Sequence, residues 1–297
     1  MKFFPRRINI EPTNYCNLRC IHCPRQIMKR EKGFMDFSLF KKIIDECKKY
    51  KNIKIWLQLL GEPLLHPKII DMIKYAKENN IKEVGVVTNG ILLNEEMIKN
   101  LFNSNLDYLC ISVDAFSKKT YEKIRCGGNY EVLIGNIKKL FKVKEEFKKS
   151  KPIISLNFVK MEENIDEFED FIKFWKPYLK GRDFIKAIEF DTWGGKIKDK
   201  GINKKNFGKR LPCSWLWYAT VILWNGDLVL CCADFDGEMI LGNVKKENIE
   251  TIWNSDKYND IRLKHLEWEF EKISICKNCQ EWKYDYLRSR YENVIRK

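Results

Sequence analysis

Apolar residues follow two alternating patterns over the first 190 residues or so. Short continuous apolar runs have the length of buried strands, and between them apolar residues recur every three or four positions, as on one face of a helix. The expected strands are residues 7–11, 53–60, 83–88, 108–113, 153–158 and 185–190. The expected helices are residues 38–50, 67–79, 94–103, 130–148 and 165–178. Strands that alternate with helices predict a parallel sheet with right-handed crossovers, so we expect an α/β fold, a partial (β/α)6 TIM-like barrel.

The pattern changes at residues 191–211, which are rich in Gly, Lys and Asn and have no periodicity, as in a linker. Two short apolar runs follow, residues 218–224 and 228–231, and Asn225-Gly226-Asp227 between them is a hairpin signal. Helical patterns return at residues 249–253 and 258–266. We therefore predict a barrel domain over residues 1–204 and a small cysteine-bearing domain, a β-hairpin plus helices, over residues 205–297.

Composition narrows the class of protein. The chain has 297 residues, 44% of them hydrophobic and 32% charged, which is enough for a buried core and excludes wholesale disorder. No apolar run reaches the roughly 18 residues of a membrane span, and the N-terminus lacks an apolar signal region, so a cytoplasmic protein without a membrane partner is expected. The net charge of +14 comes from lysines scattered beside acidic residues, which is typical of solvated helix faces rather than of a nucleic-acid surface.

The cysteines indicate chemistry. There are 11 cysteines and three histidines, and clustered thiols in a reducing compartment indicate metal or iron–sulfur ligands rather than disulfides. Cys16, Cys20 and Cys23 directly follow the first strand, where barrel active sites are built. Three thiolates can hold three irons of a four-iron cubane and leave the fourth iron open to a small molecule. With His22 as a fourth ligand, the same cysteines would instead hold a structural zinc.

At these cysteines the chain resembles the radical S-adenosylmethionine (SAM) superfamily, which is marked by this three-cysteine spacing. Gly61-Glu62-Pro63, after the second strand, looks like the motif that grips the SAM amino group through backbone oxygens, although Leu60 replaces one of its two usual glycines. The resemblance implies that an arginine at Arg125 pairs with the SAM carboxylate, for which a guanidinium is well suited. Further residues that the resemblance assigns to SAM contacts stand at later strand ends: Thr88, Asn89, Ser112, Asp114 and Asn157.

The second group of cysteines resembles the auxiliary-cluster extension called SPASM or, in its short form, twitch. The implied ligands of one auxiliary [4Fe-4S] cluster are Cys213, Cys231, Cys276 and Cys279. Four thiolates leave no open iron, so such a cluster would carry electrons rather than bind substrate. Cys232 points opposite to its neighbour on a strand and is expected to be a bystander. A four-cysteine structural zinc is the alternative.

The resemblance also implies cofactors, partners and a reaction. The cofactors are SAM and two [4Fe-4S] clusters, and an external one-electron donor such as flavodoxin or ferredoxin reduces the first cluster. Reductive cleavage of SAM gives a 5′-deoxyadenosyl radical that abstracts hydrogen from the substrate. Because no peptide-binding module precedes the first strand, we expect a small-molecule substrate, such as an aminocyclitol or sugar, and its oxidation.

Three alternatives stay open from the sequence. In a radical SAM epimerase, Cys126 is the candidate thiol that returns hydrogen to the substrate radical. In a maturase, the substrate is a peptide or protein. A zinc-stabilised nucleic-acid-binding protein is the alternative of another class, motivated by the basic charge and the CxxC pair.

Overall fold

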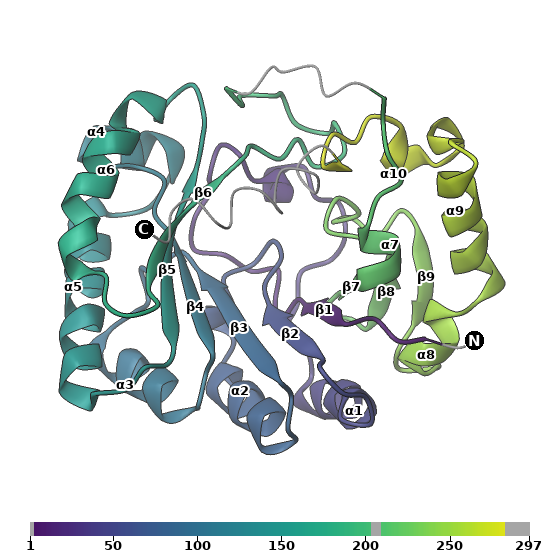
Figure 1. Cartoon of the computed structure of the whole chain (residues 1–297), viewed down its shortest axis with the longest axis horizontal. Coiled ribbons are helices and arrows are strands. Elements are labelled where there is room, and N and C mark those ends of the chain that lie inside the picture. Colours follow the sequence, from purple (N-terminus) through teal and green to yellow (C-terminus); the bar gives the residue numbers. More distant parts are fainter. Residues whose placement is uncertain (1–2, 203–208, 283–297) are drawn as a thin grey trace.

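Six parallel strands form the larger part of one sheet in the computed structural model, which describes residues 3–202 and 209–282 (Figure 1). The strands are β1 (Arg7–Ile10), β2 (Lys54–Leu57), β3 (Glu83–Thr88), β4 (Tyr108–Ser112), β5 (Ile153–Val159) and β6 (Phe184–Ile188). Each pairs in parallel with the next along the chain. The α/β prediction is confirmed, and all six expected strands are present: β3 has the expected bounds, β5 is one residue longer, and the other four are shorter or shifted.

Helices cover the outer face of this curved sheet (Figure 1). They are α1 (Phe37–Cys47), α2 (Ile69–Glu78), α3 (Glu95–Asn103), α4 (Lys118–Ile124), α5 (Tyr130–Phe147) and α6 (Phe168–Trp175). Helix α4 was not expected, because it has only seven residues and too little apolar periodicity; Ser117 caps it by accepting from the Thr120 N–H. The expected helix 165–178 is shorter, since 3-10 turns flank α6 and Pro177 lacks an N–H.

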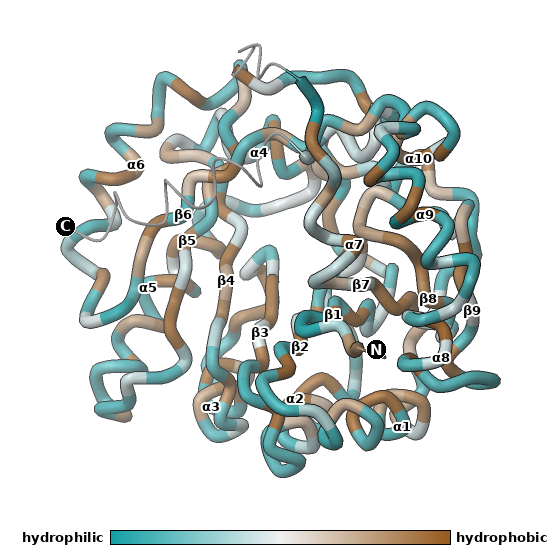
Figure 2. Tube along the Cα trace, turned by 45° about the vertical axis from the view of Figure 1, so that its right-hand side comes forward, coloured by the Kyte–Doolittle hydropathy of each residue, from teal (hydrophilic) through white to brown (hydrophobic). Residues whose placement is uncertain are grey.

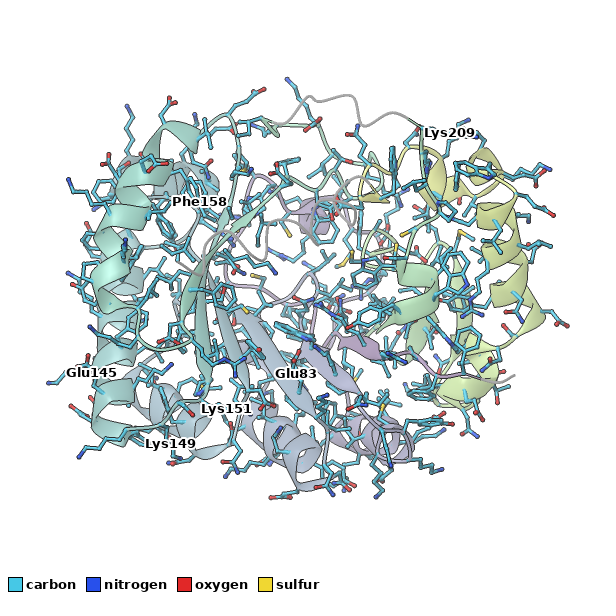
Figure 3. The ribbon with its side chains drawn as sticks, viewed as in Figure 1. Glu83, Glu145, Lys149, Lys151, Phe158 and Lys209 are labelled. Atoms are coloured by element: carbon cyan, nitrogen blue, oxygen red, sulfur yellow. The ribbon has the colours of Figure 1, made fainter. Side chains whose placement is uncertain are left out.

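The core lies between the sheet and these helices. Alternate strand residues such as Ile8 and Ile10 are fully buried on that side. Phe158 of β5 packs against Phe168 and Phe171 of α6, with ring centroids 4.9 and 5.0 Å apart (Figure 3). Hydrophobic and hydrophilic residues alternate along the helices (Figure 2). Glu145, Lys149 and Lys151 are exposed residues of the lower left periphery (Figure 3), where Lys151 pairs with the buried Asp107 at 2.5 Å.

The C-terminal part extends the same sheet. Its strands are β7 (Ala219–Ile222), β8 (Asp227–Val229) and β9 (Ile240–Asn243), and its helices are α7 (Trp215–Tyr218), α8 (Ile249–Trp253), α9 (Asp256–Leu266) and α10 (Ser274–Lys277). The predicted hairpin is confirmed: β7 and β8 are antiparallel, and Gly226 in the turn has φ 93°. Strand β7 also pairs in parallel with β1, so the sheet order is β6-β5-β4-β3-β2-β1-β7-β8-β9. The backbone edge of β1 is thereby covered.

The remaining segments are irregular or short. Three-residue 3-10 turns also occur at Pro24–Gln26, Pro63–Leu65 and Phe270–Lys272. As expected for a linker, residues 191–202 contain no helix or strand. The predicted domain boundary between residues 204 and 205 lies outside the described residues. Within the described ranges, none of the helices has the length and apolar character to cross a membrane.

Candidate active site

Three cysteine thiols lie together on the loop that follows β1, at the C-terminal edge of the parallel sheet. The Cys23 N–H donates to the Cys20 carbonyl at 3.1 Å, and the Leu18 N–H lies 3.5 Å from the Cys16 sulfur. Burial, with a smaller contribution from the nearby thiols of Cys20 and Cys16, raises the pKa of Cys23 to about 12. Burial also raises the pKa of Cys16 and of Cys20. The structure thus brings together the three residues that the sequence spacing singled out.

Gly61 and Glu62 lie beside this loop and are held by close backbone packing. A Cβ at Gly61 would stand 1.9 Å from the Thr13 carbonyl oxygen, so only glycine fits there. The buried Glu62 carboxylate accepts from the Thr88 hydroxyl and from the Asn89 N–H, each at 2.7 Å. The Glu62 side chain therefore ties the end of β2 to the end of β3. Pro63 begins the 3-10 turn Pro63–Leu65, in which the Glu62 and Pro63 carbonyls each accept one backbone N–H and keep a second lone pair.

Asn89 connects the end of β3 to the cysteine loop. Its Nδ2 donates to Asn17 Oδ1 at 2.7 Å and lies 3.9 Å from the Cys16 sulfur. Its own Oδ1 accepts from the Ile91 N–H at 3.0 Å, which fixes the orientation of the amide. Asn89 is 5% exposed, so these contacts are shielded from water. Glu62 and Asn89 thus both lie near Cys16.

Arg125, at the C-terminal end of α4, lies next to Cys20. Its guanidinium makes a buried ion pair with Asp114, and Nη1 lies 3.5 Å from the Cys20 sulfur. Asp114 adopts φ 64° and accepts from the Val159 N–H at 2.8 Å, so the carboxylate is itself held in place. Arg125 Nε is buried and has no hydrogen-bond partner within the described part of the chain. The two residues that the resemblance assigned to separate parts of SAM are thus paired with each other.

Ser112 and Asn157 occupy opposite positions on the paired strands β4 and β5. The Asn157 carbonyl accepts from the Val113 and Asp114 N–H groups at 3.1 and 3.3 Å, and its side-chain oxygen accepts from the Ser155 hydroxyl at 2.8 Å. Asn157 therefore supports the turn that carries Asp114. These residues lie at the same strand edge as the cysteine loop but on the side of the later strands.

Cys126 lies close enough to Cys20 to act on its pKa. Its thiol donates to the Lys123 carbonyl at 3.3 Å, in the last turn of α4. The Cys126 carbonyl accepts from the Arg19 N–H of the cysteine loop at 2.8 Å. The backbone of Cys126 thus holds the cysteine loop in place, while its thiol is hydrogen-bonded to a carbonyl of α4.

Sequence reasoning missed Trp193 and the position of His22. The Trp193 indole N–H donates to the His22 carbonyl at 3.1 Å, and His22 Nε2 lies 3.7 Å from Asp114 Oδ2. Burial lowers the pKa of His22 to about 4, so the ring is neutral at neutral pH. The ring faces the Asp114–Arg125 pair. No periodic or motif signal marks Trp193, which lies in the irregular segment after β6.

The second group of cysteines also converges, from three separate segments. Cys213 precedes α7, Cys231 follows β8, Cys276 lies in α10 and Cys279 follows that helix. The pKa of Cys231 is raised well above its ordinary value, first by burial and then by the thiols of Cys232, Cys279, Cys276 and Cys213. All four predicted auxiliary ligands therefore lie near one another, together with Cys232.

The donor chemistry of both groups fits iron–sulfur clusters. Buried thiols with raised pKa values are protonated without metal, and iron binding would displace those protons. Thiolate sulfur is the ligand that such clusters use. In residues 3–202 and 209–282, no three Cys, His, Asp or Glu side chains are placed to hold a single metal ion. Beside the first group, the unpartnered Arg125 Nε is a donor suited to an anionic group of a bound cofactor.

An ion pair that the sequence did not indicate joins the cysteine-loop region to the C-terminal part. Arg30 binds the fully buried Glu11 with both terminal nitrogens, at 2.7 and 2.5 Å. Arg30 Nε donates to the Phe235 carbonyl at 2.6 Å. Asp236 accepts from the Lys29 and Arg30 N–H groups at 2.8 and 3.0 Å. We call this contact of Glu11, Arg30, Phe235 and Asp236 the latch.

Comparison with known families agrees with this geometry. Residues 10–174 match the radical SAM superfamily, and residues 213–280 match the iron–sulfur cluster-binding domain called SPASM. The chain therefore belongs to the radical SAM superfamily and carries a C-terminal SPASM domain. Its cofactors are SAM, the SAM-binding [4Fe-4S] cluster and an auxiliary cluster. The prediction of the family and of its cofactors is confirmed.

Individual relatives differ in how much of the chain they cover. A tungsten-containing aldehyde ferredoxin oxidoreductase cofactor-modifying protein from Pyrococcus furiosus is 35% identical over 56% of this chain, and the match spans 46% of that relative, about half its length. An S-adenosyl-L-methionine-dependent 2-deoxy-scyllo-inosamine dehydrogenase from Niallia circulans is 24% identical over 94% of this chain and 97% of its own. Among solved structures, Streptococcus suis SuiB bound to precursor peptide SuiA has a TM-score of 0.70 at 17% identity, covering 87% of this chain and 67% of SuiB.

Proposed function

We propose that this chain cleaves SAM reductively and uses the resulting 5′-deoxyadenosyl radical to abstract hydrogen from a small-molecule substrate. The observation that carries the proposal is the position of Cys16, Cys20 and Cys23 at the strand edge, between Asn89 and Arg125. A reduced [4Fe-4S] cluster on these thiolates supplies the electron that breaks a carbon–sulfur bond of SAM. An external one-electron donor, such as flavodoxin or ferredoxin, replaces that electron.

The residues around the cysteine loop hold and orient SAM in this proposal. The backbone at Gly61 and Pro63 receives the amino group, because the Glu62 carboxylate is already engaged by β3. Arg125 receives the carboxylate through the N–H that lacks a partner, and Asp114 keeps its guanidinium oriented.

Four further residues complete the proposed SAM site. Asn89 lies beside the cluster next to Cys16, and Ser112 faces the ribose. Thr88 and Asn157 position the turns through their hydrogen bonds to Glu62 and to the Asp114 backbone.

Oxidation by two electrons is the proposed outcome. One hydrogen atom leaves the substrate carbon with 5′-deoxyadenosine, one electron passes to the oxidised auxiliary cluster, and one proton passes to a base or to water. The auxiliary ligands are Cys213, Cys231, Cys276 and Cys279, whose clustering supports this assignment. In this division, residues 1–204 are the radical SAM core and residues 205–297 are the auxiliary domain.

An aminocyclitol or sugar is the proposed class of substrate. The support is the 2-deoxy-scyllo-inosamine dehydrogenase that aligns over nearly the whole of both chains. A peptide substrate is the second candidate, because a structure of the same fold binds a precursor peptide. Turnover of an aminocyclitol panel and of a peptide panel, read by 5′-deoxyadenosine formation coupled to product, separates the two.

Iron content and spectroscopy test the ligand assignment. We expect about eight irons per chain after anaerobic reconstitution, since each cubane holds four. Replacing Cys16, Cys20 and Cys23 together by Ala should halve the iron and abolish SAM cleavage. Cys231→Ala should remove the auxiliary signal in electron paramagnetic resonance and leave uncoupled SAM cleavage, whereas the matched neighbour Cys232→Ala should keep both clusters. Stoichiometric zinc in protein made anaerobically with iron would contradict the proposal.

Turnover in deuterated water tests the oxidation. Oxidation leaves no solvent deuterium at the attacked carbon, because that hydrogen is not replaced. A thiol that returns hydrogen would instead leave deuterium there and invert the centre. If the product instead carries deuterium at an inverted carbon, and Cys126→Ala abolishes that incorporation, the oxidation proposal is wrong and the protein is an epimerase.

A further inference from the structure

His265 is a buried residue that contacts two of the proposed auxiliary ligands. It lies in the last turn of α9 and is fully buried. Its Nδ1 accepts from the Cys213 N–H at 3.2 Å, and its Nε2 lies 3.3 Å from the Cys276 sulfur. One imidazole thus bridges two segments that are distant in the sequence and that both contribute a cysteine to this site.

The backbone contact determines which ring nitrogen carries the proton. A peptide N–H can only donate, so Nδ1 must offer its lone pair to Cys213. In the neutral ring the proton is then on Nε2, directed at the Cys276 sulfur. The Phe270 and His265 rings pack nearly perpendicular to each other with centroids 5.0 Å apart, which restricts rotation of the imidazole.

We propose that His265 positions Cys276 and raises the reduction potential of the auxiliary cluster through an N–H···S hydrogen bond. This inference rests on the proposed assignment of Cys213 and Cys276 as cluster ligands. Reduction adds negative charge to the cluster and its sulfurs, so a donor aimed at a sulfur stabilises the reduced form more than the oxidised form. Because both His265 and Cys276 are buried, water does not compete for the sulfur.

The proposed tuning suits an electron acceptor. If the auxiliary cluster takes an electron from the substrate radical, a higher potential favours that transfer. His265 touches neither the substrate nor SAM in this proposal, so it acts through Cys276 as a positioning residue.

The test is a redox titration of the full chain, followed by electron paramagnetic resonance of the auxiliary cluster. His265→Phe keeps the ring and removes both nitrogen contacts. We expect about a tenfold fall in the reduced-to-oxidised ratio at a fixed potential, equivalent to a midpoint about 59 mV more negative for one electron. His265→Gln, which retains an N–H donor and an acceptor, should recover most of the shift.

His66 provides a matched control. It is also buried, its Nδ1 accepts from the Lys68 N–H at 3.0 Å, and its Nε2 lies 2.9 Å from the Met35 carbonyl oxygen. The geometry is the same except that the partner of Nε2 is a carbonyl rather than a cysteine sulfur. His66→Phe should therefore leave the midpoint of the auxiliary cluster unchanged.

If the His265→Phe variant does not bind the auxiliary cluster, its midpoint cannot be measured, so a second experiment keeps His265 in place. Full-length protein with ¹⁵N-histidine, in which Cys16, Cys20 and Cys23 are Ala, should show weak ¹⁵N coupling to the reduced auxiliary cluster. Absence of that coupling, or an unshifted midpoint in His265→Phe with the cluster intact, overturns the inference. Absence of auxiliary iron from the wild-type protein would instead overturn the ligand assignment beneath it.

Discussion

The buried ion pair of Arg30 and Glu11, which is part of the latch, should stabilise the folded protein far more than an exposed ion pair does. The side chain of Glu11 is fully buried and that of Arg30 is 12% exposed. Arg30→Met removes both bonds to the Glu11 carboxylate and the bond to the Phe235 carbonyl. The carboxylate then stays buried without its counter-ion. Breaking a buried pair in this way costs about 3–5 kcal/mol.

That cost converts to a temperature shift. With an unfolding entropy of about 2.1 cal/mol/K per residue, the 297 residues give a fall of about 5 to 8 °C in the unfolding midpoint. The double variant Arg30→Met/Glu11→Gln should recover part of this loss, because it removes the unpaired charge. The amide oxygen of the new side chain can still accept from the Trp224 backbone N–H, which donates to the Glu11 carboxylate at 3.3 Å.

The assay is thermal unfolding of anaerobically reconstituted protein by circular dichroism. The control pair is Lys48 with Asp45, which are 2.7 Å apart but 44% and 45% exposed. Lys48→Met should leave the unfolding midpoint nearly unchanged, because water screens an exposed pair. An Arg30→Met variant that unfolds within a degree of Lys48→Met would refute the reasoning that burial makes this pair strong.

Three further changes probe local packing and capping. Gly61→Ala forces a Cβ against the Thr13 carbonyl, so we expect a loss of about 1–3 kcal/mol in unfolding free energy and weaker SAM binding by calorimetry; unchanged values would contradict it. Gly135→Ala, in α5 with open space around its Cβ, should instead raise stability by about 0.5–1 kcal/mol in the same denaturation assay. Glu167 accepts four hydrogen bonds from the segment that begins α4; burial raises its pKa, but these bonds outweigh burial and lower it. Because the pKa of Glu167 is lower in the folded state, its carboxylate stabilises the fold fully above the unfolded pKa of about 4.5, and this stabilisation is lost as the pH falls further. Glu167→Gln should therefore lower the unfolding free energy by about 1 kcal/mol at pH 7 and by less below pH 4.5.

The strands and the cysteine clusters were predictable because both signals are local. Buried parallel strands read as continuous apolar runs, and β3, expected at residues 83–88, has those same bounds in the structure. Cys16, Cys20 and Cys23 are close in sequence, so their spacing alone places them on one turn. Gly226 follows Asn225 between apolar runs, which specified the hairpin.

Contacts between distant segments were not predictable from such signals. The pairing of β1 with β7 joins residues more than 200 positions apart, and no pattern within either strand identifies its neighbour. Arg30, Glu11 and Asp236 belong to three segments, and in the sequence they are three charged residues among many. His265 carried a weak signal, as one of only three histidines and close before the CxxC pair.

The missing glycine at residue 60 shows how the structure changes the meaning of a motif. A glycine pair in sequence does not reveal which member the backbone requires. Here Gly61 is the member that approaches Thr13 to a distance no Cβ allows, whereas Leu60 is buried, with 3% of its surface exposed. The fold therefore accommodates a leucine at residue 60, and the close approach of Gly61 to Thr13 stays intact. Since the proposed SAM contact at this edge is made by backbone atoms, the substitution is compatible with it, and the departure from the usual motif does not count against SAM binding.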